Sequence, residues 1–183
     1  MNRTRVALAG FLLVSAITAG GWYATRPASP PDPRLQPNEH ARDARASEIA
    51  TRFQQGVVML HAKQYDHALT AFHRVLELAP KLPEAHVNMG YTLLGLERYQ
   101  AAHDFFSSAI EIKSSQANAY YGLALALEAS GDLPGARGAM RTYIHLSKPD
   151  DPYIRKAHAA LWEWEGKDPK LAGKEIPNIG KTP

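Results

Sequence analysis

An all-α fold is predicted for this chain, built from three stacked helical hairpins and closed by one more helix at the C-terminal end. The first observation is a period of 34 residues, at which residues of the same kind recur three times. The recurring sets are Gly56, Gly90 and Ala124; Tyr65, Tyr99 and Leu133; Ala68, Ala102 and Ala136; Phe72, Phe106 and Met140; and Leu78, Ile112 and Leu146. A fixed period of this length is typical of helical hairpins that must stack to bury their apolar faces.

The second observation is an uncharged run over residues 6–24, which follows a basic segment, residues 1–5, with Arg3 and Arg5. At ~1.5 Å per residue a helix of this length reaches ~28 Å, close to the thickness of a bilayer core. Two interpretations stay open: an uncleaved signal-anchor, which is a single N-terminal transmembrane helix, or a signal peptide cleaved near Thr18-Ala-Gly20. Both place the hairpins outside the cytoplasm. The expected location is a bacterial inner membrane with the repeats facing the periplasm, or the soluble periplasm after cleavage.

A proline-rich segment follows over residues 25–40, with proline at positions 27, 30, 31, 33 and 37. Such a run favours extended polyproline geometry and cannot pack a core. We therefore expect a stiff linker between the N-terminal helix and the repeat domain, residues 41–165.

The repeats are assigned to residues 49–82, 83–116 and 117–150, each as a pair of helices. The expected helices are 47–62 and 66–78, 84–95 and 100–112, and 117–129 and 133–146. The turn within each pair has only three or four residues, so the two helices must be antiparallel neighbours. The recurring glycines and alanines fall where paired helices would cross closely, and a larger side chain there would push them apart.

A capping helix is predicted over residues 152–165, with Asp151 as its N-cap and Pro152 in its first turn. Ile154, Ala157, Leu161 and Trp164 recur at helical spacing and form one apolar stripe, which would cover the open end of the stack. Of the two neighbouring tryptophans on this helix, Trp162 and Trp164, one is expected in the core and the other in solvent. Residues 166–183 are rich in Lys, Pro and Gly and are expected to be a disordered tail.

The repeat pattern resembles the tetratricopeptide repeat. The first copy reads Gly56-x8-Tyr65-x2-Ala68-x3-Phe72-x7-Pro80, the second Asn88-Met-Gly90-Tyr91-x7-Tyr99-x2-Ala102-x3-Phe106, and the third, looser copy Tyr120-Tyr-Gly-Leu-Ala124-x11-Ala136. The resemblance implies a right-handed superhelix whose concave groove is lined by the first helix of each pair.

The resemblance also places a partner-binding groove on particular residues. They are Phe53, Val57, Leu60 and His61; then Glu84, Val87, Asn88, Tyr91 and Leu94; then Asn118, Tyr121, Leu125 and Glu128. Val57, Leu60, Val87 and Leu125 could equally be core residues between repeats. Of the Lys/Arg and Asn clamp with which relatives grip a terminal carboxylate, only Asn88 matches. An apolar groove with aromatic rings suits an amphipathic helix or an extended apolar peptide.

Composition narrows the function further. There is no cysteine, and the eight histidines include no pair at i, i+4 and no His-Glu-x-x-His, so no metal or cofactor is expected. Residues 46–165 carry 11 basic against 13 acidic residues, which does not favour nucleic acid as a partner. No phosphate-binding loop or nucleophile elbow appears, so an enzyme is not expected.

The function predicted from these observations is a protein-binding adaptor of the bacterial envelope. It would hold a segment of a partner during assembly of a complex for cytochrome c maturation, pilus or secretion assembly, or polysaccharide export. Two alternatives are a self-assembling scaffold and an accessory subunit of an enzyme complex.

Overall fold

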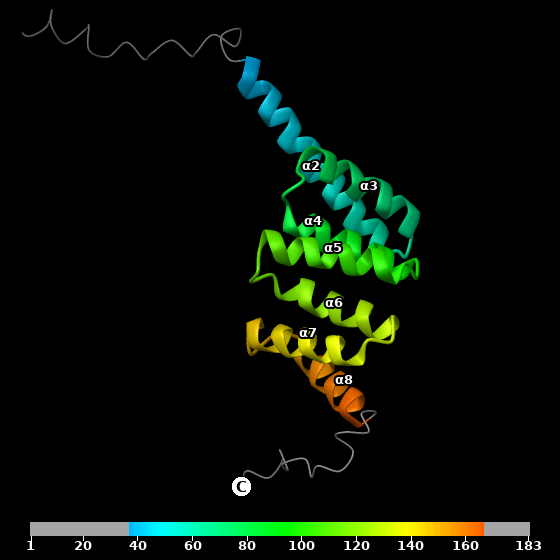
Figure 1. Ribbon diagram of the computed structural model, residues 1–183. Coiled ribbons are helices and arrows are strands. Elements are labelled where there is room, and N and C mark those ends of the chain that lie inside the picture. The colour runs from blue at the N-terminus through cyan, green and yellow to red at the C-terminus, as the bar shows by residue number, and fades with distance from the viewer. Residues whose placement is uncertain (1–36, 167–183) are drawn as a thin grey trace, which may run out of the picture. The chain divides into compact units, whose positions relative to one another are not determined.

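The computed structural model describes residues 37–166, and every regular element among them is a helix (Figure 1). The helices are α2 (Pro37–His61), α3 (Tyr65–Leu78), α4 (Pro83–Gly95), α5 (Tyr99–Ile112), α6 (Ala117–Ala129), α7 (Leu133–Leu146) and α8 (Ile154–Gly166). The all-α prediction is confirmed. The chain divides into two units between Ala44 and Arg45, and the helical stack described below belongs to the second.

The stack is a succession of helical hairpins. Within each hairpin α4 packs on α5 and α6 on α7, and between hairpins α3 packs on α4 and α5 on α6. In the first hairpin the ring of Phe72 on α3 meets that of Phe53 on α2 edge to face, with centroids 5.8 Å apart. Helix α8 packs on α7 at the C-terminal end. The predicted three hairpins with a terminal helix are therefore present (Figure 1).

Two predicted boundaries are wrong. Helix α2 begins at Pro37, ten residues before the helix expected at 47–62, so the last residues of the expected linker are helical. Proline suits this place because the first helical residue needs no N–H donor. Helix α8 begins at Ile154 rather than at residue 152. The Asp151 carboxylate accepts hydrogen bonds from the Tyr153 amide and the Tyr143 hydroxyl, both at 2.8 Å, so it holds the turn before the helix.

Small residues allow the helices to pack closely, as the period predicted. Ala68, Ala102 and Ala136 are fully buried. Phe72 and Phe106 fill the space beside them and are also fully buried. A Cβ atom built on Gly56 would lie 2.6 Å from the Phe72 ring, and one on Gly90 would lie 2.6 Å from the Phe106 ring. The recurring glycines are therefore required by the aromatic ring of the same hairpin.

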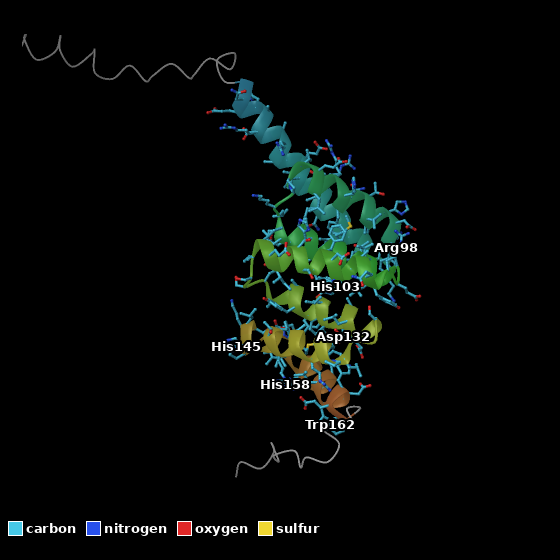
Figure 2. The ribbon with its side chains drawn as sticks, viewed as in Figure 1. Arg98, His103, Asp132, His145, His158 and Trp162 are labelled. Carbon is cyan, nitrogen blue, oxygen red and sulfur yellow. The ribbon has the colours of Figure 1, made fainter. Side chains whose placement is uncertain are left out.

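The cap of the stack is built around one tryptophan. Trp164 is 1% exposed and packs with Leu161 and Met140, and its indole N–H donates to Glu128 Oε1 of α6 at 2.7 Å. Trp162 is 67% exposed and points into solvent at the end of α8 (Figure 2). The prediction of one core and one exposed tryptophan is confirmed.

The turn inside each hairpin contains one residue with a left-handed backbone. These residues are Lys63 (φ 57°), Glu97 (φ 59°) and Gly131 (φ 85°), which are 34 positions apart. The amide after each of them bonds to a carbonyl five residues back, as Arg98 N does to Leu93 O at 2.9 Å. This is the Schellman arrangement, which glycine fits best.

Changing Gly131 to alanine should therefore lower the free energy of unfolding by ~1 kcal/mol, because an added Cβ disfavours positive φ. Nothing lies within 4 Å of that Cβ, so the cost is conformational and not steric. Glu97→Gly should change stability in the opposite direction, by ~0.5 kcal/mol. Urea denaturation followed by circular dichroism measures both, and equal signs for the two changes would contradict this account.

The predicted location in a bacterial inner membrane, with the repeats facing the periplasm, is contradicted. No helix within residues 37–166 combines the length and the apolar character needed to cross a bilayer. The basic segment 1–5, the predicted span 6–24, residues 25–36 of the linker and the tail from residue 167 lie outside the described residues.

Candidate functional site

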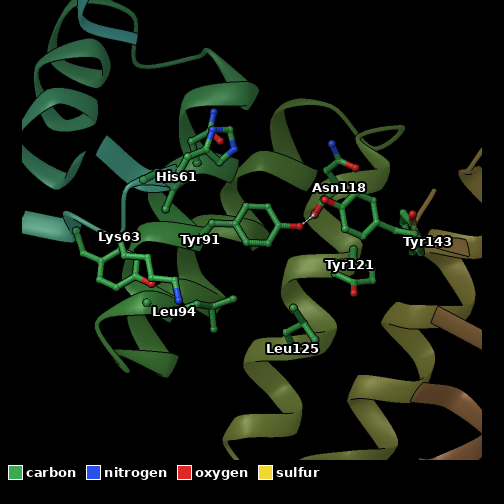
Figure 3. Close-up of a pocket in the computed structure, with 13 residues that line it drawn as sticks. His61, Lys63, Tyr91, Leu94, Asn118, Tyr121, Leu125 and Tyr143 are labelled. Carbon is green, nitrogen blue, oxygen red and sulfur yellow. Dashed lines mark hydrogen bonds between the residues drawn. The ribbon is translucent and has the colours of Figure 1, made fainter. Parts of the chain in front are cut away.

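A pocket of about 700 Å³ opens on the face formed by the first helices of the hairpins (Figure 3). We call it the groove pocket. It lies in the size range, ~300–1,000 Å³, of sites that enclose ligand groups. Its lining comes from α2, the α2–α3 turn, α3, α4, α6, α7 and the segment before α8. The residues are Leu60, His61, Lys63, Tyr65, Asn88, Tyr91, Leu94, Gly95, Asn118, Tyr121, Leu125, Tyr143 and Tyr153.

Tyr91 on α4 lies in the middle of the groove pocket (Figure 3). Its ring packs edge to face against the ring of Phe106, with centroids 5.1 Å apart and planes at 73°. Its hydroxyl donates to the Asn118 carbonyl of α6 at 3.0 Å. Tyr91 therefore joins two neighbouring hairpins as well as lining the pocket.

Three more tyrosines form the C-terminal wall of the groove pocket. The Tyr121 ring on α6 lies 5.0 Å from that of Tyr143 and 5.8 Å from that of Tyr153. Tyr143 is 1% exposed, and its hydroxyl donates to Asp151. Tyr153 is half exposed. The hydrogen bond from Tyr143 to Asp151 therefore helps to hold the wall in place. Tyr153, the third tyrosine of the wall, lies in the segment after the last repeat.

Three tyrosines of the groove pocket, Tyr91, Tyr121 and Tyr143, stay protonated at neutral pH because the pKa of each is raised. Burial raises the pKa of Tyr91 and, with smaller contributions from Tyr153 and Glu128, that of Tyr121. Burial, and then the hydrogen bond to Asp151, raise the pKa of Tyr143 to about 12. A neutral phenol keeps its O–H donor, so these rings offer apolar faces with polar edges.

The structure brings together eight of the residues placed in the groove by the sequence. They are Leu60, His61, Asn88, Tyr91, Leu94, Asn118, Tyr121 and Leu125. Leu125 is half-buried and packs on neither of the two core clusters. It is therefore the apolar lining residue with the least structural role.

Five expected groove residues do not line the pocket. Val87 is 5% exposed and belongs to the core, and Phe53 and Val57 pack against that core. Glu84 pairs with Lys113 at 3.8 Å, and Glu128 accepts the Trp164 indole N–H. Val87 adjoins the lining residue Asn88, and one position of helix rotation turns it into the core. The other four share a helical face with lining residues but contact neighbouring elements of the stack instead of the pocket.

Five lining residues were not anticipated from the sequence: Lys63, Tyr65, Gly95, Tyr143 and Tyr153. The Tyr65 ring lies against Gly95, where a Cβ would approach it to 2.2 Å. The repeat pattern marks Tyr65 only as a recurring position. Its contact with Gly95 of the next hairpin depends on how the hairpins stack, which the pattern does not show. Tyr153 belongs to no repeat, so no periodicity could have indicated it.

Within residues 37–166 there is no group of three or more His, Asp or Glu side chains arranged to hold a metal ion. The groove pocket instead combines apolar, aromatic and amide groups. Such a surface can bind a chain through contact area and a few hydrogen bonds.

Hairpins in succession, a 34-residue period and a pocket on the face of the first helices define the class of helical repeat proteins. Two models of the tetratricopeptide repeat match the sequence, one over residues 54–117 and one over residues 93–161. Together they span more than half of the chain. The chain belongs to the tetratricopeptide repeat family, and the resemblance seen in the sequence is confirmed.

Solved structures show the same fold. The TPR2B domain of yeast Sti1, in the structure titled as its complex with pHsp70, is 15% identical, with a TM-score of 0.63 over 67% of this chain and 99% of that chain. PcrH, in complex with the chaperone-binding region of PopD, is 18% identical, with a TM-score of 0.63 over 67% of this chain and 94% of that chain.

A curated relative, the BBSome complex member BBS4 of Xenopus tropicalis, is 28% identical over 106 residues, which is 58% of this chain. The chain spans 20% to 24% of the length of the curated relatives that it matches. The similarity covers a segment of 106 residues in one of these relatives and 116 in the other. The remainder of each relative lies outside the matched segment.

Proposed function

We propose that this chain is a protein-binding module that holds a peptide segment of a partner in the groove pocket. The observation that carries the proposal is the pocket itself, about 700 Å³ with apolar side chains and tyrosine rings on its walls. Leu60, Leu94 and Leu125 come from three successive hairpins, so an elongated guest would contact all three. Aromatic rings supply much of the affinity in such interfaces at little cost in side-chain entropy.

Similar proteins support the proposal. The TPR2B domain of Sti1 is described in a complex with pHsp70, and PcrH in a complex with the chaperone-binding region of PopD. The same class of guest fits the groove pocket, whose C-terminal wall is formed by Tyr121, Tyr143 and Tyr153. The envelope-assembly role expected from the sequence depended on the membrane location, and the described residues give it no support.

The test uses a photo-crosslinking amino acid placed at Leu125 in the full chain, in living cells. A partner crosslinked from this position should be trapped through one contiguous segment, which mass spectrometry of the linked peptides identifies. Leu125→Glu should weaken binding of that segment about tenfold, because a charge would be desolvated on the apolar wall. Unfolding should change little, since Leu125 packs on neither core cluster.

The matched control is Leu146 at the end of α7, an exposed leucine that does not line the pocket. The same crosslinker there, and the Leu146→Glu change, should leave capture of the segment unaltered. Equal crosslinking of one partner from both positions, or full binding by the Leu125→Glu variant, would show that the groove pocket is not the binding site.

A further inference from the structure

The rim of the groove pocket carries a cation with no ion-pair partner among residues 37–166. Lys63 lies in the turn between α2 and α3, is exposed and lines the pocket. Lys113 and Arg74 are paired, at 3.8 Å from Glu84 and 2.8 Å from Glu48. Lys63 is distinguished by its place in the pocket lining, which Lys113 and Arg74 do not share. Figure 3 shows the Lys63 side chain reaching toward Leu94 at the edge of the pocket. An ammonium group beside an apolar surface is available to a guest.

The lining of the groove pocket is charged with one sign only. Its thirteen residues include one lysine, Lys63, but no arginine, aspartate or glutamate. The Tyr91 and Tyr143 hydroxyls already donate within the protein, and the amides of the lining can both donate and accept, whereas the Lys63 ammonium can only donate. The pocket therefore favours a guest that brings an anionic acceptor.

Two carboxylates beside the tyrosine wall are engaged within the protein. Glu128 accepts from the Trp164 indole at 2.7 Å. Asp151 accepts from the Tyr143 hydroxyl and the Tyr153 amide, each at 2.8 Å. These bonds hold both carboxylates on the cap side of the tyrosine wall. Neither carboxylate forms an ion pair with Lys63. The ammonium of Lys63 therefore gives its end of the pocket a preference for an anionic group.

We propose that the guest segment carries an aspartate or glutamate side chain that pairs with Lys63, next to an apolar residue seated against Leu94 and Leu125. The inference rests on the proposed function, since it names the chemistry of the same guest. The anion is a side chain inside the segment and not a chain terminus. The pairing lies at the rim, where an apolar neighbour lowers the local dielectric and strengthens the ion pair.

The test uses two synthetic peptides as probes. Both have leucine and alanine at the same positions. The remaining polar positions carry glutamate in one peptide and lysine in the other. Both are acetylated and amidated, so terminal charges make no contribution. Fluorescence anisotropy with the full chain should show the glutamate peptide binding about tenfold more tightly, a difference that narrows as salt is added.

The deciding variant is Lys63→Glu. Its fold should persist, because Glu97 occupies the equivalent turn position of the next repeat at φ 59°. It should lose about tenfold in affinity for the glutamate peptide, whereas Lys81→Glu, in the exposed turn before α4 and outside the pocket lining, should lose none.

The outcomes separate the two proposals. Equal binding of both peptides that is lost in Leu125→Glu would overturn the acidic preference and leave the binding role of the groove pocket standing. Equal losses for Lys63→Glu and Lys81→Glu would also overturn it, because the effect would be one of net charge. Binding of neither peptide would contradict both proposals.

Discussion

Trp164→Ala is expected to lower the free energy of unfolding by ~3–5 kcal/mol, the usual cost of removing a fully buried tryptophan. Trp164 is 1% exposed and is the largest side chain of the cluster that joins α7 to α8. The change would also leave Glu128 Oε1 without the indole donor that lies 2.7 Å away. We therefore expect α8 to detach before the rest of the stack unfolds.

Urea denaturation gives the loss in stability, and amide hydrogen exchange along α8 shows whether detachment precedes global unfolding. Trp162→Ala is the matched control on the same helix and should cost less than ~0.5 kcal/mol, because its side chain is 67% exposed. Trp164→Phe keeps most of the apolar volume and loses the donor, so it isolates the hydrogen bond at ~1 kcal/mol. A loss for Trp164→Ala as small as that of the control would mean that α8 contributes nothing to the stack.

Gly122→Ala should lower the free energy of unfolding by ~2 kcal/mol, although alanine favours helix more than glycine does. A Cβ on Gly122 would lie 2.2 Å from the Phe106 ring, which is fully buried. Gly90 of α4 lies against the same ring, at 2.6 Å from its own added Cβ. The ring has no space into which it can move, so the change strains the contact between the second and third hairpins.

Gly138→Ala on α7 is the control, because that glycine is exposed and nothing lies within 4 Å of an added Cβ. It should raise stability by up to ~1 kcal/mol through helix propensity alone. The difference between the two changes then measures the steric term, and Phe106→Leu should recover part of it in the Gly122→Ala background. Stabilisation of both variants by the same amount would disprove the close contact.

The 34-residue period predicted most of the fold because it reports burial directly. Ala68, Ala102 and Ala136 recur since each faces a neighbouring helix at close range, and the structure buries all three completely. The two wrong helix boundaries, at the starts of α2 and α8, have no repeated counterpart. The start of α2 at Pro37 depends on a single proline that fits equally well at the first position of a helix or in a linker. The Asp151 side chain could cap a helix or hold a turn, and only the Tyr143 hydroxyl decides between them.

The candidate site could be predicted in part. The resemblance to the tetratricopeptide repeat predicted Asn88, Tyr91 and Leu125 as groove residues, and all three line the pocket. It could not separate Val87 from these residues, because a small rotation of α4 turns the valine into the core at 5% exposure. Tyr143 and Tyr153 enter the pocket through tertiary contacts with Tyr121, which sequence spacing does not encode. Whether any of these residues contacts a partner stays a prediction.

Tyr153 lines the groove pocket but belongs to the segment after the last repeat. The number of repeats therefore affects where Tyr153 lies relative to the rest of the lining. Repeat arrays commonly grow by duplication of whole units. Here an extra unit inserted between Tyr121 and Tyr153 would separate these two rings, whose centroids lie 5.8 Å apart. On the proposed function, a point change at Tyr153 would alter one wall of the binding surface without changing the number of repeats.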